Sequence, residues 1–144
     1  MTRRKGGVAA AVAAALALLA LAGCAAPDFG MTTSTHGRHA WALQMDNADL
    51  DDILSVTDYK AARRQGVTRA TVTIVSRHSK TLVLEARFVW MADDGTFLEG
   101  EGFVPWRTVT LKPGVPKTLK AKSFDLAAAN VRLQVRGGAR APII

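Results

Sequence analysis

The segment KTLVLEARFVWM, residues 80–91, shows the clearest alternation of apolar and polar side chains in the chain. Successive side chains of a β-strand point to opposite faces, so residues two positions apart share a face. The face that we expect to be buried carries Leu82, Leu84, Ala86, Phe88 and Trp90. The other face includes Glu85 and Arg87 but ends with Val89 and Met91, which predicts a strand in the middle of a sheet.

The same period of two continues on both sides of this segment. Residues 67–76 alternate in the same way, and the short polar connector RHSK links them to the central segment, which predicts an antiparallel hairpin. Further alternating runs follow at 106–111, 117–124 and 131–135. Asp93-Asp94-Gly95 and KPGVP, residues 112–116, are typical of turns between such strands.

The region before residue 67 is less regular. Residues 41–45 read as a first strand. Residues 48–66 fit two patterns, because Ile53, Val56 and Tyr59 have helical spacing while the same stretch also suits a strand. We favour a short strand at 53–58 and a loop or turn near 61–66. In total the chain has about seven short strands, which predicts an all-β fold, an antiparallel β-sandwich over residues 41–136.

The first 23 residues have the layout of a secretory signal. Arg3, Arg4 and Lys5 form a basic start, and a 15-residue apolar run from Val8 to Ala22 follows. This run is shorter than the roughly 20 residues that a membrane-spanning helix needs. Residues 21–24, Leu-Ala-Gly-Cys, resemble the signal of bacterial lipoproteins. An ordinary cleaved signal and an uncleaved helix are the less favoured readings.

The resemblance to lipoprotein signals implies a lipid anchor. Cleavage would fall between Gly23 and Cys24, and the Cys24 thiol and the new amino end would carry acyl chains such as palmitate. Two or more chains give a stable anchor, whereas one chain binds marginally. Because Ala25 follows the cysteine in place of the aspartate that favours the inner membrane, we expect the periplasmic face of the outer membrane. The inner membrane and the cell surface are less favoured.

Residues 24–40 read as the lipidated cysteine and a flexible tether, and residues 137–144 as a C-terminal tail. The tether contains His36 and His39, but two histidines without a cysteine or carboxylate at suitable spacing are a weak metal signal. Cys24 is the single cysteine of the 144 residues, so the domain folds without an intramolecular disulfide.

Three segments together are similar to the YcfL-like family of small bacterial lipoproteins, a domain of unknown function. They are ARFVWMADDG (86–95), VTLKPGVPKTL (109–119) and NVRLQVR (130–136). The resemblance implies an immunoglobulin-like sandwich behind a lipoprotein signal. It brings no catalytic residues to this chain.

The charge pattern favours anionic partners. After residues 1–23 are left out, 16 basic and 12 acidic residues remain, a formal charge of +4. A basic stripe that could bind an anionic partner consists of Lys112, Lys117, Lys120 and Lys122. Lysines also protect sheet edges from pairing, which is the plainer explanation of the stripe. A nucleic acid is not an expected partner of an exported protein.

Two groups of carboxylates could bind calcium or perform acid–base chemistry, but the first is better interpreted as a solvated loop or helix start and the second as a charged edge that discourages pairing between sheets. They are Asp46, Asp49, Asp51 and Asp52, and Asp93, Asp94, Glu99 and Glu101. Trp90 is expected in the core, and Trp106 in the core or, alternatively, in a ligand platform. No nucleophile motif occurs, and we expect neither a catalytic site nor a cofactor nor a metal.

These features predict a non-enzymatic, membrane-anchored periplasmic lipoprotein. Its membrane contact is the lipid on Cys24, and its sandwich binds a protein or another envelope component such as peptidoglycan. A role as an accessory to envelope or cell-wall assembly fits this picture. The alternative is a periplasmic carrier of a small ligand or a metal, with a site at the end of the sandwich near Trp106.

Overall fold

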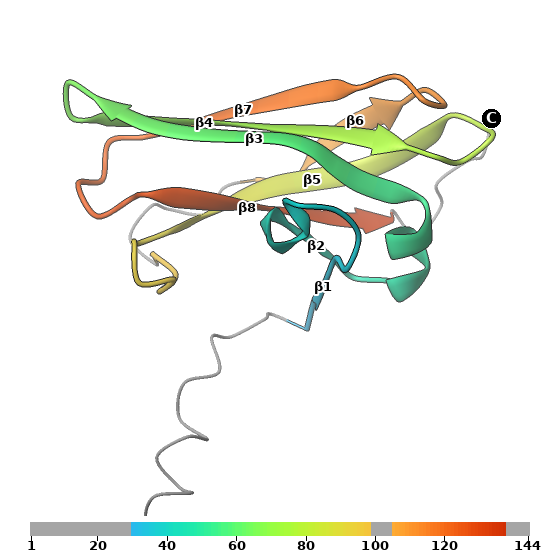
Figure 1. Cartoon of the computed structure of the whole chain (residues 1–144), viewed down its shortest axis with the longest axis horizontal. Coiled ribbons are helices and arrows are strands. Elements are labelled where there is room, and N and C mark those ends of the chain that lie inside the picture. The colour runs from blue at the N-terminus through green and yellow to red at the C-terminus, as the bar shows by residue number, and fades with distance from the viewer. Residues whose placement is uncertain (1–29, 99–104, 138–144) are drawn as a thin grey trace, which may run out of the picture.

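Two β-sheets face each other in the computed structural model, which describes residues 30–98 and 105–137 (Figure 1). The five-stranded sheet has the order β1 (Thr32–Thr33), β2 (Leu43–Met45), β8 (Asn130–Gly137), β5 (Leu82–Met91) and β6 (Arg107–Leu111). The three-stranded sheet has the order β3 (Leu54–Arg64), β4 (Val67–Ser76) and β7 (Lys117–Ser123). Short 3-10 helices, η1 (Ala40–Ala42) and η2 (Ala48–Asp52), precede β2 and β3.

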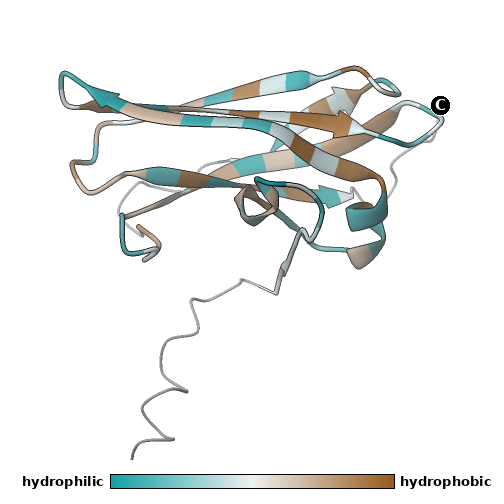
Figure 2. Cartoon of the chain, in the orientation of Figure 1, coloured by the Kyte–Doolittle hydropathy of each residue, from teal (hydrophilic) through white to brown (hydrophobic). Residues whose placement is uncertain are grey.

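The predicted all-β, immunoglobulin-like sandwich is confirmed, with eight strands in the described residues instead of about seven. The neighbouring strands are antiparallel except for β2 and β8, which run parallel. Figure 2 shows apolar and polar residues alternating along the long strands, as the period of two requires. The alternate side chains that point between the sheets make one core, which includes Leu54, Val72, Ile74, Leu84, Trp90, Val109 and Leu133.

The predicted hairpin between residues 67–76 and 80–91 is wrong. Strand β4 pairs with β3 and β7, whereas β5 pairs with β8 and β6 in the opposite sheet. The two strands bury their apolar faces in the same core from opposite sides. Alternation therefore showed which face of each strand is buried, but it could not show which strand lies beside it.

Residues 48–66 contain a short helix and then a long strand. Helix η2 ends at Asp52 and buries Leu50, and β3 then continues to Arg64. The loop or turn that we expected near 61–66 is strand as far as Arg64 and a turn only after it, because pairing with β4 extends along the whole hairpin. A two-residue turn closes it at Gln65 and Gly66, whose φ angles of 54° and 74° are both positive. Such turns match the twist of the flanking strands.

The ordered domain begins before Trp41, inside the segment that we expected to be a tether. Strand β1 pairs with β2, and the Ser34 N–H donates to the Leu43 carbonyl at 2.9 Å. The Asp51 carboxylate accepts hydrogen bonds from the Ser34 hydroxyl at 2.7 Å and the Thr35 hydroxyl at 2.6 Å. Backbone pairing of β1 and the hydrogen bonds from the two hydroxyls therefore fix the segment around residues 32–35, although its sequence is polar and shows no alternation of apolar side chains. The described tether residues therefore belong largely to the domain.

Several expected features lie outside the described residues. They are the signal over 1–23, the cleavage site at Gly23 and Cys24, and most of the C-terminal tail. In the part of the chain that is described, no helix is long and apolar enough to cross a membrane.

We predict that Gly66→Ala destabilises the protein by about 1–2 kcal/mol, because a Cβ at positive φ approaches the backbone carbonyl oxygen. The space around Gly66 is open, so the loss comes from backbone strain and not from a clash with other residues. Urea unfolding measures the effect. Gly137→Ala is the matched control, since Gly137 also has open space but no positive φ. Equal losses for the two variants would contradict the strained turn.

The Asp51 carboxylate gives a prediction about pH. Burial of Asp51 acts to raise its pKa, but hydrogen bonds from Thr35 and Ser34 outweigh it and hold the pKa below the ordinary value of 3.8. A lowered native pKa stabilises the fold above the unfolded pKa, and this contribution is lost as pH falls through the native pKa. We expect Asp51→Asn to cost about 1 kcal/mol at pH 7. The cost should shrink toward pH 2 in urea unfolding, whereas exposed Asp49→Asn should cost little at either pH.

Candidate functional site

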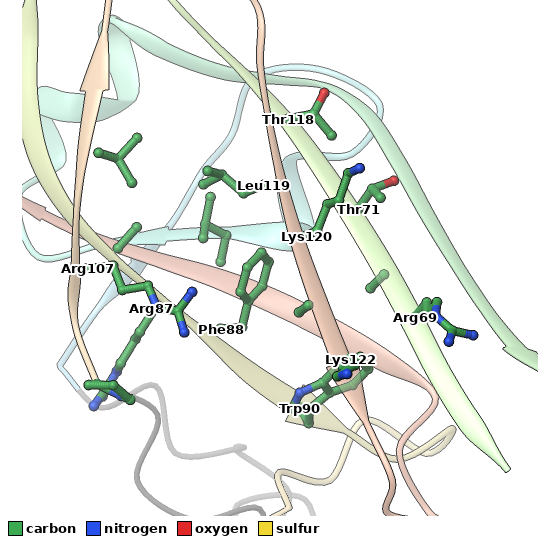
Figure 3. Close-up of a pocket in the computed structure, with 16 residues that line it drawn as sticks. Arg69, Thr71, Arg87, Phe88, Trp90, Arg107, Thr118, Leu119, Lys120 and Lys122 are labelled. Atoms are coloured by element: carbon green, nitrogen blue, oxygen red, sulfur yellow. The ribbon is translucent and has the colours of Figure 1, made fainter.

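A groove of about 820 Å³ lies between the two sheets, lined by β4 and β7 on one side and by β5, β6 and β8 on the other (Figure 3). Strands β6 and β7 are edge strands of their sheets, so the groove follows an open side of the sandwich. Its apolar lining comprises Ala70, Ala86, Phe88, Trp90, Pro105, Val109, Leu119, Ala121 and Leu133. The volume lies within the range of about 300–1,000 Å³ that is common for small-ligand sites.

Small side chains keep the groove open. Ala61, Ala70 and Ala121 lie directly opposite one another across β3, β4 and β7, on the face that points to the core. Ala86 lines the groove from the opposite sheet. Facing sheets lie about 10 Å apart, and larger side chains are needed to fill that distance to the density of a protein interior. The row of alanines leaves space, and the nearby Phe88 ring stays half-buried.

The polar part of the lining is cationic. It contains Arg69, Arg87, Arg107, Lys120 and Lys122, together with Thr71 and Thr118, and it contains no carboxylate among the described residues. Arg87 is held by Gln134, to whose side-chain oxygen it donates at 2.8 Å. The other four cations form no ion pair with a residue that the structure describes. Their positive charge is therefore not balanced by a nearby carboxylate of the described chain.

The strand register places some of these cations beside each other. Arg69 lies directly opposite Lys122, on the outer face of the three-stranded sheet. Like charges that face each other across a sheet destabilise it. The three strands of this sheet carry seven Lys and Arg residues but one carboxylate, Asp58, which pairs with Lys60 at 3.7 Å. The sheet is thus a strongly basic surface next to an apolar groove.

The predicted lysine stripe is divided between two places. Lys120 and Lys122, which alternate along β7, line the groove. Lys112 and Lys117 line a smaller hollow of about 340 Å³ around the turn between β6 and β7. Lys117 also donates to the Thr110 carbonyl at 3.4 Å, which links the edges of the two sheets.

Sequence reasoning missed the three arginines of the groove. Arg69, Arg87 and Arg107 lie on three different strands. Pairing of β4 with β7 brings Arg69 beside the lysines, and the packing of the two sheets brings Arg87 and Arg107 to the same groove. For Arg107, the sequence pattern does indicate that the side chain points toward the core face. Arg107 is two and four residues before Val109 and Leu111, so the alternation that buries these two side chains also directs Arg107 inward.

Trp106 is outside the core, contrary to the first of its two predicted roles. The guanidinium carbons of Arg87 and Arg136 lie 4.5 Å and 4.2 Å from the Trp106 ring centroid. Arg136 also donates to Glu85 at 2.6 Å. Burial and the Arg136 charge lower the pKa of Arg87, which still remains protonated at neutral pH. Two arginines thus occupy the ring surface that the ligand-platform alternative requires.

Trp90 is a core residue, whereas His36 lies near two carboxylates. Trp90 is 3% exposed in the core, as predicted. His36 lies 3.7 Å from Asp51 and 3.8 Å from Asp52. Within residues 30–98 and 105–137, no group of three or more His, Cys, Asp or Glu residues could hold a metal ion.

The second acidic cluster is only partly described. Asp94 accepts a hydrogen bond from the Thr96 N–H at 2.9 Å, and its contacts with Thr96 lower its pKa. Gly95 has a φ of 83°, which confirms the predicted turn. Glu99 and Glu101 lie outside the described residues.

Comparison with known proteins gives a family and two similar folds. A crystal structure of Campylobacter jejuni cj0090 is 16% identical with a TM-score of 0.56, and the match covers 67% of this chain and 98% of that one. A crystal structure of a DUF1425 family member from Shewanella sp. pv-4 is 28% identical with a TM-score of 0.51, covering 60% and 80%. No curated protein matches the chain. The family model described as "Protein of unknown function (DUF1425)" matches residues 42–137. The chain therefore belongs to the DUF1425 family.

Proposed function

We propose that the protein is a non-enzymatic, lipid-anchored protein of the bacterial cell envelope whose sandwich binds an anionic envelope component. The observation that carries the proposal is the groove, which has four cations without an ion pair among the described residues beside an apolar floor. Charge-assisted hydrogen bonds from Arg and Lys to a carboxylate or phosphate are among the stronger polar contacts in proteins. An anionic component would supply the negatively charged partners for these four cations.

The anchor is proposed from the sequence. Leu21-Ala22-Gly23-Cys24 offers one thiol behind small residues, after a basic start and an apolar run of signal length. Lipidation at Cys24 and cleavage after Gly23 would leave the domain attached to a bilayer. Ala25 after the cysteine favours the periplasmic face of the outer membrane, where the sandwich would act as an accessory to envelope assembly.

The proposed tether is shorter than the sequence suggested. Strand β1 begins at Thr32, eight residues after Cys24. An extended chain spans at most about 3.3–3.6 Å per residue, so the lipid and the first strand are at most about 26–29 Å apart. With the proposed anchor, the sandwich would stay near the membrane surface.

A carrier of a small ligand is the second candidate function. The groove volume of about 820 Å³ favours it, because a ligand of ordinary size would fit. The groove and not the end near Trp106 would be its site, since Arg87 and Arg136 stack against that ring. For a metal the described residues offer no cluster of ligands.

We predict that Cys24→Ser abolishes the anchor. The variant has no thiol to accept the diacylglycerol, so it should keep residues 1–23 and lose the acyl mass. Intact-mass analysis and labelling of cells with radioactive palmitate measure both effects. Thr108→Ser, at an exposed position on β6, is a control outside the signal. Palmitate labelling or a normally processed mass in Cys24→Ser would overturn the proposed anchor.

We predict that the double variant Lys120→Glu/Lys122→Glu recovers about tenfold less anionic envelope material than the natural protein after crosslinking in cells, because two attractive charges at the groove become repulsive. A tenfold change corresponds to about 1.4 kcal/mol of binding free energy. The material is lipid, glycolipid or peptidoglycan fragments that copurify with the protein, quantified by mass spectrometry. Lys80→Glu/Lys112→Glu makes the same charge change at exposed positions away from the groove. Equal recovery by both double variants would contradict a groove-centred site.

A further inference from the structure

We infer that the groove binds the acyl chain of an anionic amphiphile, with the acidic headgroup held at the rim by Lys120, Lys122 and Arg69. The inference rests on the proposed function, because it names the chemical class of the envelope component. The class is an acyl chain that ends in a phosphate or carboxylate group.

The floor of the groove requires an apolar occupant. Phe88 and Leu119 point between the sheets, lie near the middle of Figure 3 and are only partly buried. Covering apolar surface stabilises a complex, and a polar ligand would forgo this gain. Ala86 and Ala121 leave the room in which a methylene chain can contact Phe88.

The rim of the groove requires an anionic group. Lys120 and Lys122 lie along β7, and Arg69 lies on the neighbouring β4 (Figure 3). Arg69 and Lys122 are directly opposite in the sheet, so an anion between them would replace repulsion by two attractive contacts. Arg107 faces the groove from β6 in the other sheet. A neutral lipid would cover the floor but leave this positive charge unmatched.

The loop after β7 supplies an independent reason to choose a lipid. Phe124 and Leu126 are 69% and 74% exposed. The Lys122 ammonium lies 5.5 Å from the Phe124 ring centroid, so these apolar side chains adjoin a cation of the groove rim. Arg63 donates to the Asp125 carbonyl at 3.1 Å, which places the end of β3 at the same loop. Exposed apolar side chains beside cations are typical of surfaces that contact anionic membranes.

The experiment uses the mature, lipidated protein reconstituted in phosphatidylcholine vesicles. Each vesicle preparation contains one photoactivatable lipid, with the reactive group in its acyl chain. The three probes are phosphatidylglycerol, a free fatty acid and phosphatidylcholine. After illumination, mass spectrometry of peptides locates the crosslinks. We expect crosslinks on the peptides that carry Phe88 and Leu119, and about tenfold more with an anionic probe than with phosphatidylcholine, which corresponds to 1.4 kcal/mol.

Two anionic probes separate the possible sources of the headgroup. Crosslinks from phosphatidylglycerol alone assign a phosphate headgroup, and crosslinks from the fatty acid alone assign a carboxylate. Each result supports the inference, as does labelling by both. Equal labelling by phosphatidylcholine would overturn the headgroup assignment, and labelling confined to peptides outside the groove would overturn the acyl-chain site.

Matched variants test the groove itself. Ala121→Trp fills the groove and should remove the crosslinks, whereas Thr108→Trp places the same ring at an exposed position on β6 outside the groove and should keep them. Lys120→Glu/Lys122→Glu keeps the apolar floor and should lose the preference for anionic probes. This second variant tests the inference even if Ala121→Trp does not fold. If the lysine pair controls recovery of envelope material in cells but no lipid labels the groove, the amphiphile inference alone fails.

Discussion

Burial of one apolar face from each sheet is the constraint on which the structure depends. The chain forms no internal disulfide, so the two sheets are held by the contact of alternating side chains such as Val72, Leu84 and Leu133. Such contact is stabilising only where the side chains span the distance between the sheets. Along most of the sandwich the side chains span this distance. The side chains of the alanine row are too short to span it, and the groove lies where they leave space.

Protection of a sheet edge explains part of the positive charge around the groove. Lysines on an edge strand discourage pairing with another chain, and β7 is an edge strand that carries Lys120 and Lys122. Edge protection does not explain Arg69, which lies on the central strand β4 opposite Lys122. It also does not explain Arg107, which faces the groove from the other sheet. Four cations from three strands thus border one apolar space, with Arg69, Lys120 and Lys122 on the outer face of one sheet and Arg107 on the other sheet. The proposed anionic ligand would account for them together.

Alternation within a strand predicts which side chains are buried, but it does not predict which strands and residues lie beside one another. The burial of Trp90 and the inward direction of Leu119 follow from alternation within one strand, and both were predictable. The separation of β4 from β5 was not, because two strands on opposite sides of one core show the same alternation. The positions of Trp106 and Arg69 depend on which residues lie across from them. Sheet register decides that, and a single sequence without a known pairing does not reveal it.

The proposed anchor also constrains how the groove could meet a lipid. Exposed charges interact over about 8 Å at physiological ionic strength, whereas the stretch from Cys24 to Thr32 can reach about 26–29 Å. The tether alone would therefore keep the basic sheet near the membrane. It would not keep the sheet within the roughly 8 Å over which its charges attract the headgroups. Contact of Phe124 and Leu126 with the bilayer would close that distance and bring Lys122, at the same end of β7, among the headgroups. On this view the apolar loop orients the sandwich, and the cations then select the lipid.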